Sequence, residues 1–208
     1  MAVFQHLSFS ALVLLCGCAA PQTWVDLFDG ESLTGFAITG FGGEGEVYVE
    51  DGELVLTPGS PLTGVTYLGV FPAADYEIEL RGARVGGTDF FGALTFPVGG
   101  SHCTLVLGGW GGTVVGLSSI DGEDAEQGHT SLLMDFVRER SYGIRLRVTQ
   151  SHITAWIDDE RVIHEDYRGH DLSLRPEVEL SKPLGLASYS TTGAFTIWRW
   201  RPLSEQEK

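Results

Sequence analysis

The chain has 208 residues, of which 43% are hydrophobic. This is enough for one domain with a sizeable core and argues against intrinsic disorder. Its 28 acidic and 13 basic side chains give a net charge of −15, a sign that disfavours binding to nucleic acid or to anionic lipid. Glycine occupies 28 positions, nearly double the roughly 7% of average proteins. The glycine content predicts the many turns and bulges of antiparallel sheets. The negative net charge favours a neutral or cationic ligand.

The first twenty residues contain no Asp, Glu, Lys or Arg and include an apolar run of about fourteen residues. Such a run is too short to span a bilayer and is typical of a signal peptide. The segment Leu-Cys-Gly-Cys at 15–18 resembles the bacterial lipobox, which implies cleavage after residue 17, a lipid on Cys18 and a tether over 18–23. An ordinary secretory signal is the alternative. We expect an exported protein of the cell envelope that meets the membrane only through its lipid anchor.

Short β-type runs separated by turn residues follow in chain order from residue 24. Two runs at 45–50 and 53–57 flank Asp51-Gly52, a dipeptide that supplies the positive φ angles of a two-residue hairpin turn. Strict alternation of apolar and charged residues at 76–81 and 144–149 predicts strands with one buried face. A second hairpin is predicted around Asp158-Asp159. Arg175, Glu177 and Glu179, which precede Pro183, predict an edge strand whose charges discourage pairing between sheets.

Helical signals are nearly missing from the sequence, since only residues 131–139 could form a turn or two of helix. Roughly a dozen strands with so little helix predict an all-β domain over 24–202, followed by a polar tail at 203–208. The expected architecture is a two-sheet antiparallel jelly-roll sandwich. With Cys16 and Cys18 in the leader and at the lipid, only Cys103 remains in this domain, so no intramolecular disulfide is expected.

Five segments together follow a known family pattern, and they lie at 24–36, 49–54, 75–80, 155–160 and 195–197. They resemble the 3-keto-disaccharide hydrolase domain family, a former domain of unknown function. The resemblance implies a sandwich of the concanavalin A-like lectin/glucanase type that binds carbohydrate, and cleavage of glycosides previously oxidised to 3-keto sugars. Many members carry Asn-Ser-Gly where this chain has Gly-Gly-Thr-Asp-Phe-Phe-Gly at 86–92.

Glu77, Glu79 and Arg81 lie on one face of a predicted strand, with neighbouring carboxylates about 7 Å apart. Two carboxylates at such spacing can act as general acid and base on a glycoside. The Glu-x-Asp-x-x-Glu strand of laminarinase-type sandwiches is missing, so an ion-paired or solvated surface is the favoured interpretation.

Trp110 is flanked by two glycines on each side, which strips side chains from around one indole and allows a ligand to approach the backbone. An indole ring can stack on the apolar face of a pyranose. The alternative is a pair of bulged strand ends with Trp110 in the core. The sequence leaves both interpretations open.

Two further clusters are candidates for chemistry. Asp89 and His102 flank an apolar run and could reach one pocket, where an imidazole can transfer protons near neutral pH; a structural histidine is the alternative. The loop containing Asp121, Asp124 and Glu126 could offer hard oxygens to a divalent cation such as calcium. Its spacing differs from the EF-hand loop, so an acidic surface turn is favoured.

Three hypotheses follow for function. The first is a hydrolase or lyase acting on a 3-keto-glycoside at one concave sheet face, with Trp110 stacking on the sugar. In it His102 transfers protons with Asp89 or Glu79, while Arg81 and Asp121 bind hydroxyls. The second is a non-catalytic carbohydrate-binding surface lipoprotein, motivated by the missing Asn-Ser-Gly and paired-carboxylate patterns. The third is a structural envelope protein with a flat, filled face.

Overall fold

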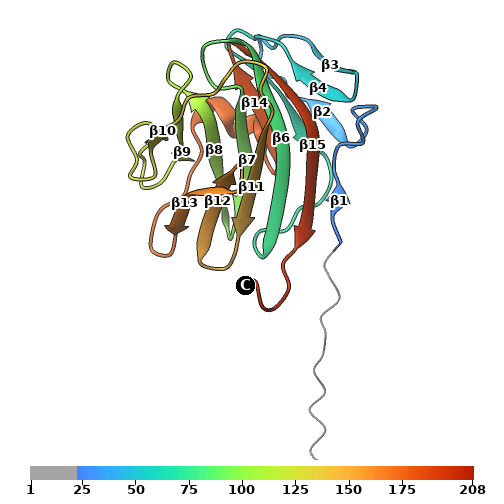
Figure 1. Cartoon of the computed structure of the whole chain (residues 1–208). Coiled ribbons are helices and arrows are strands. Elements are labelled where there is room, and N and C mark those ends of the chain that lie inside the picture. The colour runs from blue at the N-terminus through green and yellow to red at the C-terminus, as the bar shows by residue number, and fades with distance from the viewer. Residues whose placement is uncertain (1–22) are drawn as a thin grey trace, which may run out of the picture.

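The computed structural model describes residues 23–208. The expected signal segment, most of the tether and Cys18 lie outside the described residues. Figure 1 shows two antiparallel sheets packed face to face, which confirms the predicted two-sheet sandwich. Within residues 23–208, no helix is both long and apolar enough to cross a membrane.

Each sheet is built from strands far apart in the chain. Sheet A runs in the order β13 (Glu160–Asp166), β12 (His152–Ile157), β11 (Tyr142–Val148), β6 (Tyr76–Gly87), β15 (Thr191–Pro202), β4 (Glu53–Leu56) and β3 (Val47–Glu50), with β1 (Val25–Asp26) on β15. Sheet B runs in the order β10 (Leu132–Leu133), β9 (Val114–Ser118), β8 (Ser101–Gly109), β7 (Gly92–Val98), β14 (Gly185–Tyr189), β5 (Leu62–Tyr67) and β2 (Phe36–Ile38). The long strands β6 and β15, green and red in Figure 1, lie side by side at the centre of sheet A.

The core lies between the sheets and is filled by alternate side chains of both. Ile78 and Leu80 of β6 face it from sheet A, and Leu105 and Leu107 of β8 face it from sheet B; all four are buried. Burial of apolar area at about 25 cal/mol per Å² is the main stabilising contribution, since the one cysteine of the described residues is unpaired.

The turn chemistry predicted from the sequence is confirmed. Asp51 and Gly52, with φ of 51° and 81°, join β3 to β4. Asp158 and Asp159, with φ of 48° and 66°, join β12 to β13. Both pairs have the positive φ values of a two-residue hairpin turn.

Two local predictions were wrong. Residues 131–139 form no helix; they contain β10 and an extended stretch that inserts Phe136 into the core against Phe91, with ring centroids 5.0 Å apart. The charged segment from Arg175 to Glu179 was expected to be an edge strand, but residues Pro176–Ser181 form the 3₁₀ helix η1. Proline begins this helix, and Val178 anchors it on sheet B.

Candidate functional site

The outer face of sheet B carries a pocket of about 280 Å³ with a floor of small side chains. The floor consists of Ala93 of β7, Thr104 and Val106 of β8, and Ser118 of β9. The residues that alternate with them in these strands are large and face the core. Because side chains of a strand alternate between faces, large inward residues and small outward ones leave a hollow over the middle of the sheet.

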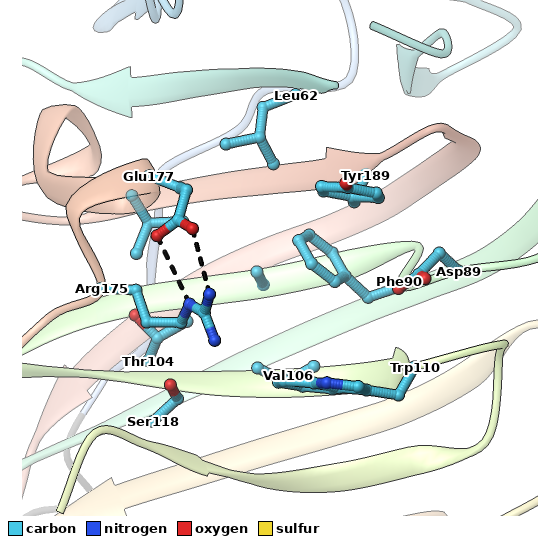
Figure 2. A pocket seen from close by; sticks show the side chains of 12 residues that line it. Leu62, Asp89, Phe90, Thr104, Val106, Trp110, Ser118, Arg175, Glu177 and Tyr189 are labelled. Atoms are coloured by element: carbon cyan, nitrogen blue, oxygen red, sulfur yellow. Dashed lines mark hydrogen bonds and ion pairs between the residues drawn. The ribbon is translucent and has the colours of Figure 1, made fainter. Parts of the chain in front are cut away.

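Three aromatic side chains, Phe90, Trp110 and Tyr189, lie along one side of this pocket (Figure 2). The rings of Phe90 and Tyr189 have centroids 5.5 Å apart at an interplanar angle of 48°. Trp110 packs against a small cluster that includes Val106, and its indole is partly exposed rather than in the main core. Aromatic faces beside a few polar groups are typical of small-molecule sites.

The glycines around Trp110 form the turn that presents it. The backbone of Trp110 has a φ of 46°, and Gly111 and Gly112 follow with φ of 87° and 102°. A Cβ on Gly112 would lie 2.3 Å from Nη1 of Arg84. That guanidinium donates to the carbonyl of Gly112 at 3.1 Å and to that of Phe136 at 2.6 Å. The turn therefore needs glycine both for its dihedral angles and for the close approach of Arg84.

The opposite side of the pocket is polar. Arg175 donates two hydrogen bonds to Glu177, from Nε to Oε2 at 3.3 Å and from Nη2 to Oε1 at 3.0 Å (Figure 2). A third, from Nη1 to Asp124 Oδ2, measures 2.8 Å. The guanidinium of Arg175 lowers the pKa of Glu177, so this carboxylate is ionised at neutral pH.

Asp89 connects the loop of Phe90 to the turn of Trp110. Its Oδ1 accepts from the backbone N–H of Phe90 at 2.8 Å, and its Oδ2 accepts from that of Gly111 at 3.4 Å. Its own N–H donates to Thr191 Oγ1 at 2.9 Å. The carboxylate therefore lies at the pocket and fixes the position of two of the three rings.

The six side chains predicted to share one concave face do not meet there. Asp89 and Trp110 line the pocket on sheet B together. His102 lies at the opposite end of β8, about 26 Å from Trp110 at the usual rise per residue, and desolvation, followed by the nearby Lys182, lowers its pKa. The expectation that Asp89 and His102 reach one pocket was wrong, because the strand between them is extended.

Glu79 and Arg81 point outward from sheet A, on the other side of the sandwich. Arg199 donates to Glu79 Oε2 from Nε at 3.0 Å and from Nη2 at 2.8 Å, which is the ion-paired surface favoured from the sequence. Both residues border a polar hollow of about 320 Å³ beside Trp156, whose ring lies 4.1 Å from the guanidinium of Arg145.

Asp121 lies in the loop after β9 and has partners of its own. It accepts hydrogen bonds from His170 Nδ1 at 2.7 Å and from the N–H of Asp171 at 2.8 Å. Asp124, three residues later, turns instead toward Arg175. Since the two carboxylates face different partners, they do not converge on one point as the oxygen ligands of a calcium ion would.

Most of the pocket lining leaves no signal in the sequence. No local pattern points to Phe90, Tyr189 or the small floor residues, and the alternating charges of Arg175 and Glu177 favour an edge strand. Trp110 among its glycines and Asp89 were the two local signals that led to the site. The others become neighbours only when β7, β8, β9, β14 and η1 assemble.

Comparison with known proteins identifies the fold. No protein-family model and no curated protein matches the sequence. Among solved structures, the carbohydrate-binding module CBM66 from Bacillus subtilis is similar with a TM-score of 0.54 and 14% identity over 80% of this chain and 95% of that one. The apo Crh5 transglycosylase aligns with a TM-score of 0.57 and 13% identity over 91% and 87% of the two chains.

A third similar structure is the exoplasmic/lumenal domain of VIP36 in its Ca²⁺/Man3GlcNAc-bound form. Its TM-score is 0.57, with 10% identity over 86% of this chain and 87% of that one. The likeness is one of fold. At such identities it shows a shared β-sandwich architecture, because function depends on the residues placed on the fold.

Proposed function

We propose that this protein binds carbohydrate in the pocket on the outer face of sheet B. The observation that carries the proposal is the row of three aromatic rings, Phe90, Trp110 and Tyr189, beside a floor of small side chains. A flat ring can cover the apolar C–H face of a pyranose, while a small floor leaves room for it. The proteins of similar fold include a carbohydrate-binding module and a transglycosylase, which supports this class of ligand.

Polar groups around the pocket suit the hydroxyls of a sugar. Thr104 and Ser118 offer hydroxyl groups from the floor, and Glu177 and Asp89 offer carboxylate oxygens from two sides. A few directed hydrogen bonds among apolar contacts are what orient a ligand in such a site. The volume, about 280 Å³, lies just below the usual range of roughly 300–1,000 Å³, so we expect one or two sugar rings to be held.

The experiment is isothermal titration calorimetry with a panel of neutral mono- and oligosaccharides. We expect Trp110→Ala to weaken binding at least tenfold, which corresponds to about 1.4 kcal/mol. Trp156→Ala is the matched control, because Trp156 is a partly exposed tryptophan on the outer face of sheet A. Retained binding in Trp110→Ala, loss in Trp156→Ala, or no binding to any sugar of the panel would reject the proposal.

A second candidate is cleavage of 3-keto-glycosides in the same pocket. Ordinary glycoside hydrolysis requires a carboxylic acid of raised pKa, whereas Arg175 lowers the pKa of Glu177. An ionised Glu177 can accept a proton, although the contact with Arg175 makes it a weak base. A carbonyl at C3 acidifies the hydrogen on C2, which such a base can abstract. The electron pair then expels the leaving group from C1, whose oxygen takes up a proton, and water adds at C1 of the unsaturated ketone to give the 3-keto sugar. Release of 3-keto sugar by the wild type, lost in Glu177→Gln while plain sugars still bind, would support this activity; no turnover would leave the binding function alone.

We also propose that the protein is exported and held at the cell envelope by a lipid on Cys18, because the segment at 15–18 resembles a lipobox. Cys18→Ser should move the protein from the membrane fraction to the soluble fraction of the host cell. Cys16→Ser is the control and should leave it at the membrane. An unchanged distribution of Cys18→Ser would refute the anchor.

A further inference from the structure

A cluster of ionisable side chains lies away from the sugar pocket, where three segments meet. His129 belongs to the connection between β9 and β10, Glu165 to β13, and His170 to the segment after β13. His129 Nε2 lies 2.9 Å from Glu165 Oε2, and His170 Nε2 lies 3.9 Å from Glu165 Oε1. The two imidazole rings therefore aim their Nε2 atoms at the two oxygens of one carboxylate. The side chain of Glu165 is only 11% exposed.

Asp121 determines which nitrogen of His170 carries a proton. His170 Nδ1 donates to Asp121 Oδ2 at 2.7 Å, and the N–H of Asp171 holds the other oxygen of this carboxylate at 2.8 Å. A neutral imidazole with its proton on Nδ1 presents a bare lone pair at Nε2. In that tautomer, Nε2 and Glu165 Oε1 are two acceptors that face each other across 3.9 Å. A cation between them would bind both.

The spacing suits a zinc ion. Zinc binds imidazole nitrogen and carboxylate oxygen at about 2.0–2.2 Å, so two ligand atoms of a tetrahedral site stand about 3.4 Å apart. The gap between His170 Nε2 and Glu165 Oε1 is 3.9 Å, and a small rotation of either side chain would close the difference. A carboxylate on the far nitrogen of a metal-binding histidine is also the usual support for such a ligand, and Asp121 already occupies that position.

We propose that His129, Glu165 and His170 form a Zn²⁺ site, with Asp121 as the residue that orients His170. The ion would take the place of the proton between His129 Nε2 and Glu165; a neutral His129 then carries its proton on Nδ1, and a protonated one releases a single proton to water. In residues 23–208, no group of three or more His, Cys, Asp or Glu side chains is already arranged to hold a metal ion. His129 must therefore turn slightly, which its 53% exposed side chain permits. Three protein ligands leave a fourth position for water.

The electrostatics and connections of the cluster agree with this assignment. The net charge of −15 favours the approach of a cation. The ion would link the β9–β10 loop to the segment after β13. Two backbone hydrogen bonds already join these segments: Ser119 N–H donates to the carbonyl of Ser173 at 2.9 Å, and Asp121 N–H donates to that of Asp171 at 2.8 Å. It would thereby stabilise the folded state without depending on the proposed sugar binding.

The test is a Zn²⁺ titration of chelator-treated protein prepared without a polyhistidine tag. We expect one equivalent to bind, with at least tenfold weaker binding in His129→Ala and in His170→Ala, and roughly 10- to 100-fold weaker binding in Asp121→Asn. Co²⁺ in place of Zn²⁺ should give the visible absorption bands of a tetrahedral site in the wild type and lose them in these variants. Zn²⁺ should also raise the melting temperature.

The control is His164→Ala, which removes an imidazole from the stacked pair His152–His164 on sheet A, with centroids 4.8 Å apart. This variant should bind Zn²⁺ as tightly as the wild type. The side chain of His129 is 53% exposed, and the circular dichroism spectrum of metal-free His129→Ala should match that of the wild type, which separates loss of binding from unfolding. Failure of the wild type to bind, retention in both His129→Ala and His170→Ala, or loss in His164→Ala would overturn the proposal.

Discussion

Glu77 offers the sharpest test of how the outer face of sheet A is stabilised. Its side chain is 2% exposed, yet it lies on the outward face of β6 between two arginines of the flanking strands. Arg147 Nε donates to Oε2 at 2.7 Å, and Arg201 Nη2 donates to Oε1 at 3.1 Å. Glu77→Gln keeps the shape but removes the more deeply buried of the two carboxylates that Arg147 and Arg201 share, and leaves them with Glu207. Removing one member of a buried ion pair costs about 3–5 kcal/mol, a large share of a typical unfolding free energy of roughly 5–15 kcal/mol.

Glu79→Gln is the matched control, two residues further along the same face. Its side chain is 26% exposed and binds Arg199 alone, so its replacement should cost at most about 1 kcal/mol. Urea unfolding at pH 7, followed by tryptophan fluorescence, gives both free energies. Added salt should reduce the smaller loss more than the larger one, since buried charges are screened less. Equal losses for the two variants, or a loss below about 1 kcal/mol for Glu77→Gln, would refute this reasoning.

Three further predictions concern packing and protonation. Gly82→Ala should destabilise the protein by about 1–3 kcal/mol in urea unfolding, because the added Cβ would lie 2.3 Å from the ring of the buried Phe195. Gly86→Ala is the control and should cost less, because the atom nearest to its added Cβ is 3.5 Å away. Burial raises the pKa of Cys103 to about 12, so iodoacetamide at pH 8 should label it, by mass spectrometry, only after unfolding. The hydrogen bond from Arg201 lowers the pKa of Glu207 from 4.5 to about 2. The ionised Glu207 therefore stabilises the folded state fully above pH 4.5, and this contribution is lost as the pH falls toward 2. Glu207→Gln should remove this part of the pH dependence of the unfolding free energy.

Local patterns in the sequence predict the strands of this fold but not their neighbours. Alternation at 76–81 and 144–149 and the Asp-Gly and Asp-Asp turns depend on contacts close in sequence, and the structure has them. The pairing of β6 with β15, more than a hundred residues later, leaves no local pattern. Strand order is determined by the whole core, so the sequence could predict the class of sandwich and not its topology.

The segment at 175–181 was misassigned for a related reason. Its alternating charges match a solvated edge strand, but an edge strand requires a neighbour with a free edge. Pro176 cannot donate a hydrogen bond to such a ladder, and Val178 finds an apolar contact with Leu62 and Ala187 on sheet B. Tertiary packing thus made a short helix from a strand-like pattern and placed Arg175 and Glu177 at the pocket.

The two outer faces of the sandwich differ in a way that explains where the pocket forms. On sheet A, outward positions carry long charged side chains that neutralise one another, such as Glu77 with Arg147, and these fill the surface. On sheet B, outward positions in β7 and β8 carry Ala93, Thr104 and Val106, which are too short to do so. All seven residues of β7 are buried, so hydropathy alone describes a strand with core on both sides. Side-chain size at alternate positions distinguishes such a strand from one that borders a pocket. Large residues on one face and small ones on the other indicate a sheet that packs on its inner side and leaves room for a ligand on its outer side.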